Sequence, residues 1–94
     1  MSATVADLLA QARAAHARYR AALPHRAEGD PTGPILPGDS AAARTALQDA
    51  LAARTAAIAQ DTEQNDPAWQ AEAASVYDHH ALVAFYRAQL ARVA

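Results

Sequence analysis

Residues 67–93 read PAWQAEAASVYDHHALVAFYRAQLARV, and large side chains recur along this stretch every seven residues. Spacings of three and four residues place side chains on one face of an α-helix, so the stretch predicts a single helix with a heptad stripe. The repeat itself is Trp69, Val76, Val83 and Leu90, and the positions three residues further on are Glu72, His79, Tyr86 and Val93.

Two more helices are predicted upstream, at about 3–23 and about 40–64. Apolar residues recur in both at helical spacing. Their expected core residues are Val5, Leu8, Leu9, Tyr19, Leu47, Leu51 and Ile58. Polar residues that favour the N-cap position mark where the helices begin. The candidate caps are Ser2 or Thr4, Asp39 or Ser40, and Asp66 followed by Pro67 at the first helical position.

Residues 24–39, PHRAEGDPTGPILPGD, separate the first two predicted helices. Four of the five prolines and all three glycines of the chain lie here. Proline fixes φ and glycine permits positive φ, so the segment predicts an ordered connector rather than a helix. We expect Ile35 and Leu36, in its middle, to anchor it onto the helices.

The predicted fold is all-α, in one domain over residues 1–94. Alanine, the strongest helix former, accounts for 29 of the 94 residues. The arrangement is either a three-helix bundle or a long hairpin of the second and third helices, with the first helix joined through the Pro/Gly-rich connector. Because an alanine methyl group buries little apolar area, the core is thin, and a second copy or a larger protein partner is expected to complete it.

Composition excludes several classes of function. The chain has no cysteine, which excludes disulfides, thiolate catalysis and cysteine-ligated zinc. No apolar run approaches the roughly 18 residues of a membrane span, and no signal peptide is recognisable. The expected location is therefore the cytoplasm, or a virion if the protein derives from a phage. All eight positive charges are arginine, which together with the alanine content indicates a GC-rich bacterial or phage genome.

The adjacent histidines His79 and His80 raise the question of a metal site. Two ligands on one helix must be three or four residues apart to reach the same ion, and adjacent residues diverge by about 100°. On a continuous helix Glu72 lies two turns from His79, which is too far to share an ion. We therefore expect no metal and no cofactor; if a metal is bound, His16, His79 and His80 are the candidate ligands.

Two further kinds of site are argued against. Ser75 and His79 are four residues apart, but the interior of a helix offers no free N–H group for an oxyanion, so we expect the chain not to be an enzyme. Residues 1–26 carry a net charge of +3 and residues 27–66 a net charge of −5. The whole chain is at −2, which argues against nucleic-acid binding, since that requires dense positive charge.

Four polar residues interrupt the predicted apolar faces. A lone buried charge is unfavourable, so such residues tend to pair with one another or to face a partner. They either fix the register between helices or form a small polar pocket, and the first interpretation is favoured. The residues are His16, Arg54, Glu72 and His79.

The sequence thus predicts a small, non-enzymatic, helical protein–protein interaction or assembly subunit, such as a bacterial adaptor or a phage structural component. Its partners are expected to be further copies of itself, a larger protein assembly, or both, and not a membrane. The alternative is a helical bundle that binds a metal or small ligand through its histidines. The expected interface is the stripe of Trp69, Val76, His79, Val83, Tyr86 and Leu90.

Overall fold

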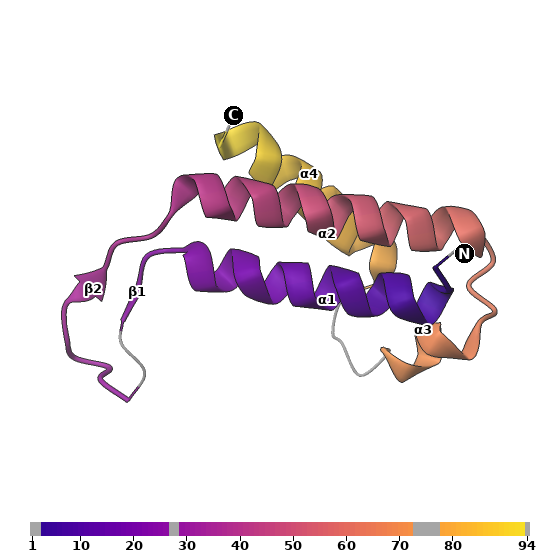
Figure 1. Ribbon diagram of the computed structural model, residues 1–94, viewed down its shortest axis with the longest axis horizontal. Helices are drawn as coiled ribbons and strands as arrows, with labels where there is room; N and C mark the ends of the chain where they lie inside the picture. The colour runs from indigo at the N-terminus through magenta and orange to yellow at the C-terminus, as the bar shows by residue number, and fades with distance from the viewer. Residues whose placement is uncertain (1–2, 27–28, 73–77, 94) are drawn as a thin grey trace.

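A computed structural model describes residues 3–26, 29–72 and 78–93 of the chain (Figure 1). This described part is mostly helical. Its elements are α1 (Val5–Ala22), β1 (His25–Arg26), β2 (Ile35–Leu36), α2 (Ser40–Gln60), α3 (Pro67–Ala71) and α4 (His79–Val93). In this part of the chain, no helix combines the length and the apolar character needed to cross a membrane.

The helices begin at the caps that the sequence predicts. The Thr4 hydroxyl accepts a hydrogen bond from the Asp7 N–H at 3.1 Å, and the Asp7 carboxylate accepts one from the Thr4 N–H at 3.2 Å. Asp39 caps α2, its side chain accepting from the Ala42 N–H at 3.0 Å. Asp66 caps α3, with Pro67 in its first turn. Each cap satisfies backbone donors that a helix leaves free at its start.

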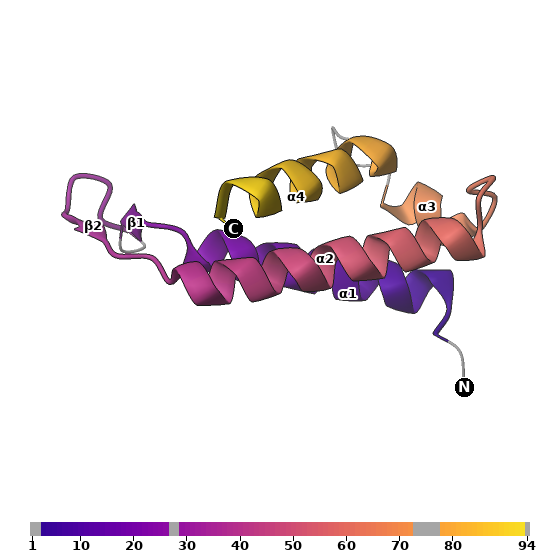
Figure 2. The ribbon, with the colours of Figure 1, turned by 90° about the horizontal axis from the view of Figure 1, so that it is seen from above.

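Helices α1 and α2 lie side by side and antiparallel, and they form one layer (Figure 1). The shorter helices α3 and α4 lie on one face of this layer (Figure 2). Helix α4 packs against α2 and runs in the opposite direction to it, so α1 and α4 run the same way. The backbones of α1 and α4 do not pack closely together, and only long side chains bridge them.

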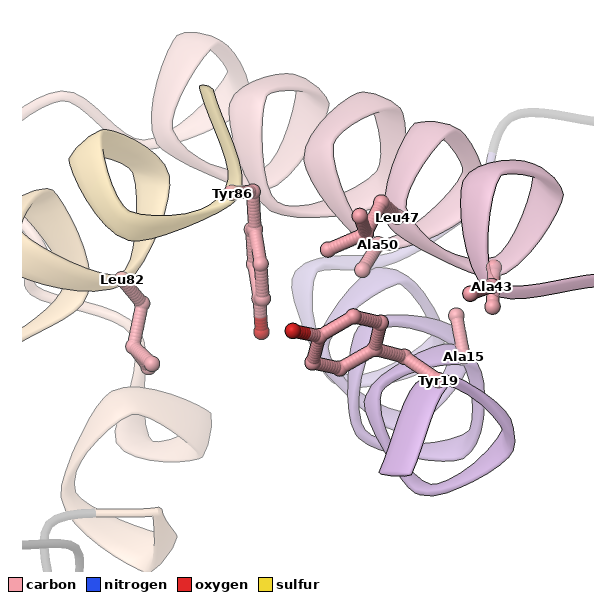
Figure 3. Close-up of a cluster of buried hydrophobic side chains, with 8 residues drawn as sticks. Ala15, Tyr19, Ala43, Leu47, Ala50, Leu82 and Tyr86 are labelled. Carbon is pink, nitrogen blue, oxygen red and sulfur yellow. The ribbon is translucent and has the colours of Figure 1, made fainter. Parts of the chain in front are cut away.

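The core consists of two clusters joined along α2. The larger one holds Leu47 of α2 and Tyr86 of α4, both with no exposed surface, together with Tyr19 of α1 (Figure 3). The smaller one forms at the N-terminal end of α1, around Leu9 and Trp69. Between α1 and α2 the buried side chains are mainly alanines, which allow two helices to approach closely: Ala12, Ala15, Ala43, Ala46, Ala50, Ala53 and Ala57.

The single helix predicted over 67–93 is wrong. Helix α3 ends at Ala71 and α4 begins at His79, behind Asp78, whose side chain accepts a hydrogen bond from the Ala81 N–H at 2.7 Å. The stripe position Val76 lies outside the described residues, as does Ser75. The heptad spacing predicted continuity because it counts only apolar side chains. It takes no account of the hydrogen bond that the Trp69 indole N–H donates to the Asp61 carboxylate at 3.0 Å, which ties α3 to the end of α2.

The connector also differs from expectation. Strands β1 and β2 pair antiparallel, His25 with Leu36 and Arg26 with Ile35, and this hairpin projects beyond the ends of α1 and α2 (Figure 1). The anchoring role predicted for Ile35 and Leu36 is wrong, because their exposed fractions are 61% and 39%. A backbone hydrogen bond holds the connector to the helices: the Asp39 N–H donates to the Ala22 carbonyl at 2.7 Å.

The close approach of the connector to the end of α1 leads to a prediction about Gly38. A Cβ atom at this position would lie 2.6 Å from the Ala22 carbonyl oxygen and 2.8 Å from the Pro24 ring. Because these are backbone and ring atoms that cannot rotate away, Gly38→Ala should lower the free energy of unfolding by about 1–3 kcal/mol. Urea unfolding followed by circular dichroism measures this. Thr32→Ala, at an exposed position of the same connector, is the control and should change little; equal stabilities for the two variants would contradict the prediction.

Candidate functional site: a buried polar network beside an open groove

Three of the four predicted polar residues meet where α2, α3 and α4 come together. The Arg54 side chain is buried, with 1% of its surface exposed, and it donates from both terminal nitrogens. Nη2 lies 2.7 Å from Glu72 Oε1, and Nη1 lies 2.9 Å from His79 Nδ1. We call Arg54, Glu72 and His79 the Arg54 network. Three of the four polar residues therefore contact one another within the chain.

The Arg54 contact fixes the chemical state of His79. A guanidinium has donors and no acceptor, so His79 Nδ1 must present its lone pair. The imidazole is therefore neutral, with its proton on Nε2, and neither nitrogen retains a lone pair for a metal ion or for a substrate proton. The ring also contacts the Trp69 indole, with ring centroids 4.5 Å apart.

Burial lowers the pKa of His79 below its ordinary value of 6.5, and the positive charge of Arg54 lowers it further. The Glu72 carboxylate acts in the opposite direction but does not reverse the shift. Protonation would place a second positive charge 2.9 Å from Arg54 in a buried site. The neutral form of His79 is thus part of the folded structure.

Glu72 lies nearer to His79 than the sequence analysis expected. The expected separation of two helical turns is wrong because α3 ends before Glu72, and Glu72 Oε2 lies 3.8 Å from His79 Nδ1. The same oxygen lies 3.9 Å from Arg13 Nη1 at the edge of the network. The carboxylate, 6% exposed, therefore sits among three nitrogen-bearing side chains from three helices.

The fourth polar residue, His16, does not join the Arg54 network. Its Nδ1 lies 2.9 Å from the Tyr86 hydroxyl, which links α1 to α4. Burial lowers the pKa of His16, and the charges of Arg20 and Arg54 lower it further. Burial also raises the pKa of the Tyr86 hydroxyl, so that Tyr86 stays protonated at neutral pH. His16 lines the space between α1 and α4, whereas Tyr86 is fully buried behind it.

That space is a groove of about 580 Å³ open to solvent, which we call the α1–α4 groove. It is lined by His16, Tyr19, Arg20 and Leu23 of α1 and by Ala81, Leu82 and Phe85 of α4. The ring of Phe85 stacks on His16, with ring centroids 6.1 Å apart and an interplanar angle of 19°. Figure 3 shows the side chains of Tyr19 and Tyr86 turned toward each other.

The rim of the groove is apolar and exposed. Phe85 is 38% exposed and Leu23 is 36% exposed. These two are among the four large hydrophobic residues of the described chain that are exposed, the others being Ile35 and Leu36 of the hairpin. A contiguous apolar surface of this kind typically marks a place where another molecule binds.

The described residues of the predicted interface do not form a continuous exposed stripe. Trp69, His79, Val83 and Tyr86 are buried within the chain itself, and Leu90 is half-buried. Little of this stripe is therefore accessible to a partner in the folded chain. Their role as an interface remains a prediction.

The three histidines considered as metal ligands lie in different surroundings. His16 faces Tyr86, His79 faces Arg54, and His80 is exposed, with Nε2 3.1 Å from Gln64 Nε2. Across residues 3–26, 29–72 and 78–93, no cluster of three or more potential ligand side chains has an arrangement that could hold a metal ion.

Sequence reasoning missed most of the groove. Phe85 falls between the heptad positions, so the predicted stripe gives it no role. A usable signal was present: Leu82 and Phe85 follow Asp78 at helical spacing. What the sequence could not show is that this face of α4 lies beside α1 without closing on it.

The His79 geometry predicts a pH dependence of stability. The unfolded chain takes up protons near pH 6.5, whereas folded His79 and His16 resist protonation. Stability should therefore be fully present above pH 6.5 and should fall as the pH is lowered below that value. His79→Asn should reduce this loss, because the Asn oxygen can accept from Arg54 and does not titrate. Thermal unfolding between pH 5 and 8 checks this; His80→Asn is the control, and an identical effect of the two variants would contradict the prediction.

The buried ion pair predicts non-additive stabilities. Glu72→Gln leaves the buried Arg54 charge without its carboxylate and should lower the free energy of unfolding by about 3 kcal/mol. Adding Arg54→Met should restore part of this loss, since the unpaired charge is then removed. Urea titration of the single and the double variant measures the difference in the free energy of unfolding. The control is Asp49→Asn, which breaks the exposed Arg18–Asp49 pair and should change stability by about 1 kcal/mol or less. A double variant no more stable than Glu72→Gln alone would refute the pairing.

Comparison of the chain with protein-family models, with curated proteins and with solved structures finds no match. The function is therefore inferred from the geometry of the Arg54 network and of the α1–α4 groove. The network is buried, and the Nδ1 lone pair of His79 faces Arg54. The groove is open, apolar at its rim and wide enough for side chains of another molecule.

Proposed function

We propose that this protein is a non-enzymatic helical interaction or assembly subunit, such as an adaptor or a structural component of a larger protein assembly. In this proposal α1, α2 and α4 act as a three-helix bundle whose edge between α1 and α4 is left open. The groove at that edge receives apolar side chains of another protein chain. The Arg54 network positions α4 so that the groove keeps its shape.

The observation that carries the proposal is the exposed apolar rim of the groove. Phe85 and Leu23 lie on different helices, and both are more than one-third exposed. The rings of His16 and Tyr19 lie against Phe85, with centroids 6.1 and 6.2 Å away. Aromatic side chains around a concave apolar surface are enriched where proteins bind one another.

The surface area of the chain supports the same conclusion. The folded chain exposes 6187 Å², whereas a compact monomer of 9.9 kDa exposes about 5,200 Å². The radius of gyration is 14.8 Å, against about 12.4 Å for a compact chain of this length. The hairpin accounts for part of the excess.

The alternative function, metal or small-ligand binding through histidines, has less support. His79 has no free lone pair, and His16 Nδ1 already faces the Tyr86 hydroxyl. A small ligand in the groove would find apolar contacts but few fixed polar groups to orient it, which binding pockets normally provide. It is an outcome of the experiment below.

A matched crosslinking experiment tests the proposal. Leu23 is replaced by a diazirine amino acid of similar size, and illumination is carried out in the producing cells. A protein crosslinked from position 23 is expected, because this side chain lies at the rim of the groove. Leu36 has nearly the same exposed fraction, 39% against 36%, but lies on the hairpin, and the same replacement there should give little product. No protein crosslinked from position 23, or equal yields from both positions, would refute the proposal.

A further inference from the structure

We propose that the groove of one copy is filled by the groove of a second copy, in a twofold-symmetric, antiparallel dimer. This inference rests on the proposed function and specifies its partner. The groove faces would meet so that Phe85 and Leu23 of each chain enter the hollow of the other. The contact would then contain α1 and α4 from both copies, a layer of four helices of the kind found in helical bundles.

The first argument is that the surface is self-complementary. A twofold dimer uses the same patch on both subunits, so the patch must carry both the projections and the hollows that receive them. The α1–α4 groove does so: Phe85 and Leu23 project from its rim, whereas Ala81, which also lines it, offers only a methyl group. Large side chains facing small ones allow two such surfaces to interdigitate.

The second argument is the distribution of charge along the groove. Arg20 lies at the end of the groove formed by the C-terminal part of α1. Asp78 lies about one helical turn before the lining residues Ala81 and Leu82. Since α1 and α4 run in the same direction, Asp78 is at the opposite end of the groove from Arg20. A twofold axis across the groove exchanges its two ends. It therefore places Arg20 of each copy near Asp78 of the other.

Both of these charges are available for such a pairing. Arg20 is exposed and forms no ion pair within the described residues, and Asp78 is exposed and caps the start of α4. Asp78 is also the sole acidic residue between position 73 and the end of the chain. A parallel arrangement would instead bring Arg20 against Arg20, which is unfavourable. The charges therefore favour the antiparallel dimer.

The third argument is area. The chain exposes roughly 1,000 Å² more than a compact monomer of its mass, and each subunit of a standard interface buries about 800 Å². At the open face between α1 and α4 the Phe85 ring is 38% exposed. A second copy would cover it without any change in the packing of α1 and α4 on α2.

Sedimentation equilibrium of the full chain at micromolar concentrations tests the dimer. The unmodified chain should be dimeric. Arg20→Glu should weaken the dimer by about tenfold or more, because Glu at position 20 would face Asp78 of the second copy. Arg87→Glu makes the same change of charge on α4 at a position outside the groove, and it should leave the dimer unchanged.

The pairing itself is tested by a second substitution. Asp78→Asn removes the charge but keeps a side chain that caps α4 about equally well. In this background Arg20→Glu should lose most of its effect, to about threefold or less, since the repulsion is gone. Circular dichroism checks that all variants are folded.

Three results would overturn the inference. The chain could be monomeric, the dimer could be insensitive to Arg20→Glu, or this substitution could weaken it equally in both backgrounds. If the chain is monomeric and the crosslink from Leu23 captures a different protein, the dimer is wrong and the proposed function stands. If there is neither a dimer nor a crosslinked protein, both are wrong.

Discussion

The buried guanidinium of Arg54 is the constraint on which the arrangement of the shorter helices depends. A group that only donates hydrogen bonds cannot be buried in α2 unless acceptors are brought to it. Glu72 supplies one from the end of α3, and His79 supplies another from the start of α4. The end of α3 and the start of α4 are thereby fixed to the same point of α2.

The alanine content explains why the rest of the surface stays open. Alanine faces allow α1 and α2 to pack closely, but they contribute little buried area per residue. Two large side chains of α4, Leu82 and Tyr86, complete the core above α2. The exposed rings at this edge follow from a composition that favours helix formation over core volume.

Local signals in the sequence were reliable, and long-range ones were not. The predicted caps Thr4, Asp39 and Asp66 are confirmed because capping depends on residues only two or three positions apart. The prediction of a continuous helix over 67–93 was wrong because it rested on apolar spacing within the segment. That spacing takes no account of the contacts that Glu72 and Trp69 make with residues elsewhere in the chain. The pairing of polar residues was predictable from the unfavourable burial of a lone charge. Which residues pair, and that Phe85 borders a groove, depends on packing angles that spacing does not contain.

Trp69 gives this molecule a built-in optical reporter. It is the single tryptophan of the chain, its indole N–H is bonded to Asp61, and its ring lies against His79. Indole emission responds to water and to nearby charge, so its wavelength and intensity follow the junction of α2, α3 and α4 alone. Release of α4 would therefore be visible as a spectral change before the pair of long helices separates.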